Sequence, residues 1–195
     1  MARETNEKVL KEKRSRYSAV SIIMRQLFGV RMAGMPGYIL LQDVVYKHLE
    51  DKSLTTDELV EWAVKHFVFD ITVDDAYDEI FQVVTQKLPE AENGEEDVMM
   101  ILPKVLNEAT DLYKKRMLYG KVTEAVHRLN IPPLIEHDII SILFEIKRGK
   151  TIEQALKKLA NEDVAEVNEA KKLHNIILVA FSSEAALLEF AKTIE

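Results

Sequence analysis

The chain has 195 residues, of which 47% are hydrophobic and 30% are charged, a composition that suits a folded protein with a substantial core. It contains no cysteine, which excludes disulfides, thiolate metal sites and cysteine nucleophiles. The formal net charge is −7, and six Gly and five Pro are few for this length, so long helices are favoured over many turns.

Apolar residues recur at helical spacing along most of the chain, which predicts an all-α fold. The capping-box pattern Thr-x-x-Glu/Gln begins two helices, at Thr55 and Thr151, and Thr72 is the expected cap of another. Pro103 is expected in the first turn of a long helix, where its missing N–H costs little. The predicted helices cover residues 5–30, 38–50, 55–67, 73–88, 103–129, 133–148, 151–160 and 164–181, with a final helix from 183.

The same helical unit is found twice, about 95 residues apart: residues 40–59 align with 135–154, and 73–76 align with 167–170. This predicts a tandem duplication, with two similar four-helix units packed into one helical body. Because identity between the halves is low, two unrelated runs of amphipathic helix are the alternative. The expected division is an N-terminal helical unit with a basic first helix at 1–89, an acidic linker at 90–102 and a C-terminal helical unit at 103–195.

One segment fits two kinds of structure. Residues 175–181, NIILVAF, are apolar and rich in β-branched side chains, which would suit a strand. Their partner in the repeat is an amphipathic helix, so a buried helix is predicted here as well.

Positive charge is concentrated near the N-terminus. Residues 1–34 hold eight Lys/Arg and three acids, whereas residues 43–97 hold sixteen Asp/Glu and four Lys. Because Lys and Arg on a helix neutralise phosphates and Tyr can stack, the first helix is a candidate nucleic-acid surface. A solvated helix, or a basic arm lying on the acidic part of the chain, is the alternative. The candidate residues are Lys8, Lys11, Lys13, Arg14, Arg16, Tyr17 and Arg25.

Basic residues also recur in the second half of the chain, where a role in reading bases stays open. These residues are Lys147, Arg148, Lys150, Lys157, Lys158, Lys171 and Lys172.

Three aspartates are the candidates for a metal site. Asp74, Asp75 and Asp78 form a DDxxD pattern, which enzymes that handle diphosphates use to hold Mg²⁺. The alternative is a solvated face, because these acids fill the first turns after Thr72, where the helix dipole favours negative charge. The aligned positions of the second half offer only one acid, so the solvated face is the favoured interpretation.

A second metal hypothesis rests on the doublet His137-Asp138, a feature of helical metal-dependent phosphohydrolases. The further ligands would be His127 and Asp163. The spacing from His127 is short, and Asp138 aligns with Asp43, which follows a glutamine. A structural role for the aspartate is therefore favoured.

No phosphate loop, dinucleotide motif or hydrolase elbow is present, and no cofactor is expected. The charged N-terminus and the lack of a long apolar run predict a cytoplasmic protein with no membrane partner. We expect a non-enzymatic helical binding or assembly protein whose partner is itself or another protein. The alternatives are a nucleic-acid-binding regulator that uses the basic first helix, and a metal-dependent phosphohydrolase or diphosphate enzyme.

Overall fold

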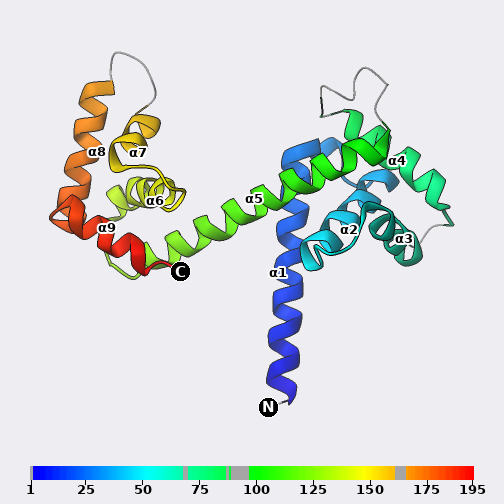
Figure 1. Cartoon of the computed structure of the whole chain (residues 1–195). Helices are drawn as coiled ribbons and strands as arrows, with labels where there is room; N and C mark the ends of the chain where they lie inside the picture. Colours follow the sequence, from blue (N-terminus) through cyan, green and yellow to red (C-terminus); the bar gives the residue numbers. More distant parts are fainter. Residues whose placement is uncertain (1, 68–69, 87, 89–96, 161–165) are drawn as a thin grey trace. The chain divides into compact units, whose positions relative to one another are not determined.

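The computed structural model describes residues 2–67, 70–86, 88, 97–160 and 166–195, and the side chains of all of these except 2–12, 166 and 167. Across these residues the chain is all-helical, as predicted, with no strand (Figure 1). None of the described helices combines the length and the apolar character that a membrane span needs. The helices are α1 (Ala2–Phe28), the 3₁₀ turn η1 (Val30–Met32), α2 (Pro36–Glu50), α3 (Thr56–His66), α4 (Val73–Thr85), α5 (Val98–His127), α6 (Pro133–Lys147), α7 (Ile152–Leu159), α8 (Glu166–Phe181) and α9 (Glu184–Thr193).

The chain divides into two compact units, and the division falls inside α5. Unit 1 spans Met1–Tyr113 and unit 2 spans Lys114–Glu195, and each has its own hydrophobic core. In unit 1, α2 contacts α1, α3 and α4, and in unit 2, α6 contacts α7, α8 and α9. The inward face of α2 is fully buried at Leu40, Leu41, Val44 and Val45.

Local sequence determines where several helices begin. Thr55, Thr72 and Thr151 each accept a hydrogen bond from the backbone N–H three residues later, and the side chain of that later residue accepts one in return. These are the three predicted caps, and the two capping boxes expected from their sequence pattern are confirmed. Residues 175–181 belong to α8, so the helical interpretation of that segment is also confirmed. The segment is buried only in part, because Ile176 and Ile177 are buried whereas Leu178 and Val179 are exposed.

The start of α5 differs from the prediction. The helix begins at Val98, and Pro103 lies inside it, not in its first turn. An interior proline costs about 3 kcal/mol, because it removes the hydrogen bond to the carbonyl of Met99. Val98, Ile101 and Leu102 are buried in the core of unit 1. Burial of side chains of this size contributes about 1.5–3 kcal/mol each, so tertiary packing outweighs the local preference.

The packing within the two units has a common feature. Helices α2, α3 and α4 all contact one another in unit 1, and α6, α7 and α8 do so in unit 2. Mutual contacts among three helices do not establish that the two sets superpose, so the tandem duplication stays a prediction. Of the expected linker, residues 90–96 lie outside the described part of the chain, and residues 98–102 belong to α5.

Two glycines offer a matched test of the packing between α2 and α4. A Cβ at Gly37 would lie 2.5 Å from the backbone oxygen of Glu79, whereas a Cβ at Gly120 in α5 would meet nothing within 4 Å. We expect Gly37→Ala to destabilise unit 1 by about 1–3 kcal/mol through overpacking. We expect Gly120→Ala to stabilise its helix by about 0.5–1 kcal/mol.

Urea denaturation followed by circular dichroism measures both glycine variants. Trp62 is the chain's only tryptophan and lies in unit 1, so its fluorescence reports the effect of Gly37→Ala separately. Equal stability of the wild type and Gly37→Ala would show that α2 and α4 do not approach as closely as described.

Candidate functional site

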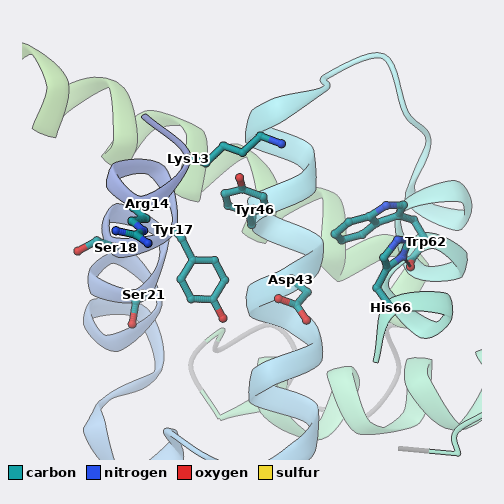
Figure 2. A pocket seen from close by; sticks show the side chains of 9 residues that line it. All are labelled: Lys13, Arg14, Tyr17, Ser18, Ser21, Asp43, Tyr46, Trp62 and His66. Atoms are coloured by element: carbon teal, nitrogen blue, oxygen red, sulfur yellow. Dashed lines mark hydrogen bonds between the residues drawn. The ribbon is translucent and has the colours of Figure 1, made fainter. Parts of the chain in front are cut away.

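An open groove of about 670 Å³ lies on unit 1, with α1 on one side, α3 on the other and α2 between them (Figure 2). Its volume is within the range of roughly 300–1,000 Å³ that is usual for pockets that bind small molecules. Three helices that are separate in the sequence therefore contribute to one surface. The groove is lined by Lys13, Arg14, Tyr17, Ser18 and Ser21 of α1, Asp43 and Tyr46 of α2, and Trp62 and His66 of α3.

Helical periodicity explains the contribution of α1. Val20, Ile23 and Met24 are fully buried and fix the face of α1 that packs into unit 1. The residues that line the groove lie on the neighbouring stripe, at spacings of one, three and four residues, so they remain accessible. Tyr17 is 46% exposed, although its ring packs against a residue of α2.

Two aromatic pairs face each other across the groove. The rings of Tyr17 and Tyr46 meet edge to face, with centroids 5.7 Å apart. The rings of Trp62 and His66 are stacked at 4.6 Å. Lys47 extends from α2 so that its Nζ lies 5.5 Å from the centroid of the Trp62 ring, a cation–π contact that favours this orientation of the indole. The groove thus has aromatic surfaces on both sides.

The orientation of His66 bears on whether the groove can act as a nucleophilic site. Its Nδ1 lies 2.7 Å from the carbonyl oxygen of Trp62. A carbonyl only accepts, so Nδ1 carries the hydrogen and, in the neutral ring, Nε2 is the acceptor. In a Ser-His-Asp triad the Nδ1–H is given to the aspartate. Although Ser18, Ser21 and Asp43 line the same groove, this hydrogen bond to Trp62 is not compatible with triad chemistry.

Asp43 lies between the two aromatic pairs (Figure 2). Its side chain is partly buried, and burial raises the pKa of the carboxyl above its ordinary value of 3.8, although the nearby His66 acts in the opposite direction. Within the described residues, no side chain donates a hydrogen bond to this carboxylate or forms an ion pair with it. A carboxylate therefore faces the groove with no donor among the residues that the structure describes.

The structure brings together three of the seven predicted nucleic-acid-binding residues, Lys13, Arg14 and Tyr17. Arg16 is half-buried, Arg25 is exposed, and neither lines the groove. The side chains of Lys8 and Lys11 lie outside the described part. The other residues of the groove were not predicted from the sequence: Ser18, Ser21, Asp43, Tyr46, Trp62 and His66.

A signal for part of this set was present in the sequence. Asp43 and Tyr46 are three residues apart on α2, and Trp62 and His66 are four apart on α3, so each pair occupies one helix face. Aromatic rings on a helix face other than the one that packs into the core suggest a binding surface. Only the tertiary packing shows that these faces meet.

The predicted metal ligands have other surroundings. Asp74, Asp75 and Asp78 are exposed on α4, and Asp75 completes the cap by accepting a hydrogen bond from the Thr72 hydroxyl at 2.6 Å. Among the described residues there is no group of three or more His, Asp or Glu placed to hold a metal ion.

The His-Asp doublet is not assembled with a further ligand in the described part of the chain. His127 binds Glu136 through Nδ1, His137 is exposed, and Asp138 is half-buried. The other expected ligand, Asp163, lies outside the described residues.

Most basic residues of the second half take part in contacts within unit 2. Glu145 is 3% exposed, and its carboxylate contacts Arg148 at 3.1 Å, Lys150 at 2.9 Å and also Lys158. Lys147 donates to the backbone oxygen of Ile194. Burial alone would raise the pKa of Glu145, but hydrogen bonds from Lys158 and Lys150 and the charge of Arg148 outweigh it, and the pKa is lowered. This cluster joins α6 to α7 and is explained by the fold.

No family model matches the chain, and no curated protein or solved structure matches it either. The site must therefore be interpreted from its own geometry and chemistry.

The ion pairs of Glu145 are expected to make the stability of unit 2 depend on pH. We expect Glu145→Gln to destabilise unit 2 by about 1–2 kcal/mol at pH 7. This is less than the roughly 3–5 kcal/mol for a fully buried pair, because the three cations are partly exposed. Since the folded-state pKa is lowered, the wild type gains this stability above the ordinary value of 4.5 and loses it as the pH falls through the folded value. Calorimetry between pH 3 and 7 should show the two proteins converging in acid, and a constant difference would contradict this account.

The pH dependence of stability that we expect from Asp43 is opposite to that expected from Glu145. Because its pKa is raised in the fold, the ionised carboxylate subtracts stability at neutral pH. We expect Asp43→Asn to raise the stability of unit 1 at pH 7. The difference should disappear as the pH falls through the folded-state pKa.

The fluorescence of Trp62 during urea denaturation measures the stability of the Asp43 variant at each pH. Asp74→Asn is the matched control, because it removes an exposed charge near the start of α4 and should lower stability slightly. A less stable Asp43→Asn variant at pH 7 would show that a partner within the fold satisfies this carboxylate.

Proposed function

We propose that the chain is a non-enzymatic binding protein that holds single-stranded nucleic acid in the groove of unit 1. The observation that supports this proposal is the meeting of Lys13, Arg14 and Tyr17 of α1 with Trp62 and the other rings of α2 and α3 in one open groove. Cations and accessible rings side by side are the two components of surfaces that bind single strands, and here Tyr17 is exposed while Tyr46 and Trp62 are partly buried.

The rings supply the first component. Tyr17 and Tyr46 stand on one side of the groove and Trp62 on the other (Figure 2). Bases stack on such rings with about 1–3 kcal/mol per base, largely independent of sequence. A double helix has its bases already stacked on each other and does not offer these faces, so the groove fits an unpaired strand.

The cations supply the second component. Lys13 and Arg14 lie on the α1 side of the groove, where they can neutralise phosphates. The sequence just before them adds Lys8 and Lys11 to the positive charge of this end of the chain.

Acidic residues limit where a phosphate can bind. Residues 43–97 hold sixteen acids against four Lys, and the overall charge is −7. Because this segment also supplies the α2 and α3 sides of the groove, phosphates should be held along α1, and binding should be sensitive to salt.

A protein partner, which includes a second copy of this chain, is the competing outcome. It explains the accessible rings, but it gives no particular reason for two cations and a carboxylate in the same groove. A nucleotide carries an anion, a flat ring and hydrogen-bond donors in one unit, and so it matches all three features.

Removing the two cations tests the proposal. We expect Lys13→Ala with Arg14→Ala to weaken binding of a mixed-sequence RNA 12-mer, measured by fluorescence anisotropy between 50 and 200 mM salt. The slope of log affinity against log salt should become shallower by about 1.4, since each phosphate contact on a single strand contributes about 0.7. The sole tryptophan should also be quenched when the wild type binds, because Trp62 lies in the groove.

The matched control is Lys114→Ala with Lys115→Ala, which removes the same charge at exposed positions of α5 outside unit 1. This variant should bind like the wild type. If neither RNA nor DNA single strands bind saturably at 50 mM salt, the proposal is wrong. Light scattering that shows an oligomer dispersed by Lys13→Ala with Arg14→Ala would instead support a protein partner.

A further inference from the structure

The position of Asp43 restricts what can bind in the groove. It lies on α2 three residues before Tyr46, on the stripe of that helix that faces the groove, whereas the neighbouring residues Val44 and Val45 are fully buried. In Figure 2 its carboxylate lies between Tyr17 on one side and Trp62 with His66 on the other. A base held between these rings would present its edge to this carboxylate.

The carboxylate requires donors. An ionised aspartate only accepts hydrogen bonds, and it can do so through both oxygens at once. Within the described residues its carboxylate has neither a hydrogen-bond donor nor an ion-pair partner, although Lys13 and Arg14 line the same groove. The side chain is only partly buried and lines an open groove, so water can reach it, and a ligand that displaces this water must supply donors of its own.

The four bases differ in what they offer to two adjacent oxygens. The Watson–Crick edge of guanine presents two neighbouring donors, N1–H and N2–H₂, with the spacing of a carboxylate. Adenine and cytosine place an acceptor nitrogen beside their amino group. Uracil and thymine place a carbonyl on either side of a single N–H. Only guanine therefore donates two parallel hydrogen bonds to a carboxylate without placing one of its own acceptor atoms against a carboxylate oxygen.

We infer that Asp43 selects guanine among the bases that stack in the groove of unit 1. This inference rests on the proposed function, because it requires that a nucleic-acid strand binds there. Tyr17, Tyr46 and Trp62 would hold the ring of the base, Lys13 and Arg14 would bind the adjoining phosphates, and Asp43 would identify the base.

A cationic ligand is the alternative occupant. A guanidinium or ammonium group would also satisfy Asp43, and it could lie on the face of an aromatic ring. Lys13 and Arg14 argue against this occupant, since they line the same groove and would repel a second cation.

The experiment uses the full chain and RNA nonamers of uridine with one central position that is guanosine, inosine, adenosine, cytidine or uridine. A single guanosine avoids association between strands. Inosine keeps the N1–H and lacks the N2 amino group, so it removes one of the two donors. We expect the guanosine strand to bind about tenfold or more tightly than the uridine strand, as for a bidentate side chain–base contact, with inosine between them.

Two variants complete the design. Asp43→Asn offers one acceptor and one donor, so it should lose the preference for guanosine over adenosine and cytidine while it still binds the uridine strand. Asp74→Asn removes an exposed aspartate of α4 in the same unit and should keep the preference. Circular dichroism confirms that each variant is folded.

The outcomes separate the two proposals. Equal wild-type affinity for all five strands, or a guanosine preference that persists in Asp43→Asn, overturns the selection of guanine and leaves strand binding intact. Failure of every strand to bind overturns the proposed function. Binding of an arginine-rich peptide that depends on Asp43, without binding of any strand, assigns the groove to a cationic partner and overturns both.

Discussion

The packing of α2 is the constraint on which the organisation of unit 1 depends. This helix contacts α1, α3 and α4, and Gly37 near its start allows the backbone of α4 to come close. Packing on three sides buries most of the surface of α2. The stripe that holds Asp43 and Tyr46 stays accessible and forms the middle of the groove. The groove is therefore a consequence of core packing, because α1 and α3 are held on either side of the accessible stripe of α2.

This arrangement places a destabilising group where a ligand can reach it. Desolvation raises the pKa of the partly buried Asp43, and the described fold supplies no donor to its carboxylate, whereas the buried carboxylate of Glu145 receives three cations. Two acidic residues of similar chemistry therefore have opposite effects on stability. A residue that lowers stability without stabilising any part of the fold is typical of functional positions. The contrast between Asp43 and Glu145 therefore supports the interpretation of the groove as a binding site.

The part of the structure that could be predicted from the sequence is the part that depends on neighbours along the chain. The caps at Thr55, Thr72 and Thr151 involve residues three apart, and helical periodicity is equally local. The prediction for Pro103 was wrong because the burial of Val98 and its neighbours in the core of unit 1 outweighs the local cost of proline. The groove was predicted only in part for the same reason. Lys13, Arg14 and Tyr17 belong to a basic run that is visible in the sequence, while the α2 and α3 residues of the groove are brought to them only by tertiary contacts.

The two basic regions of the chain show why a count of charges is a weak guide to binding. In the second half, Arg148, Lys150 and Lys158 converge on one buried carboxylate, so those charges already have partners within unit 2. In the first half, Lys13 and Arg14 lie beside an open groove and exposed rings. A phosphate that binds Arg148, Lys150 and Lys158 must compete with Glu145, and it would remove the contacts that join α6 to α7. At the groove, the described contacts impose no such competition. Availability of the cations, more than their number, is therefore the reason why we propose unit 1 as the place for a polyanion.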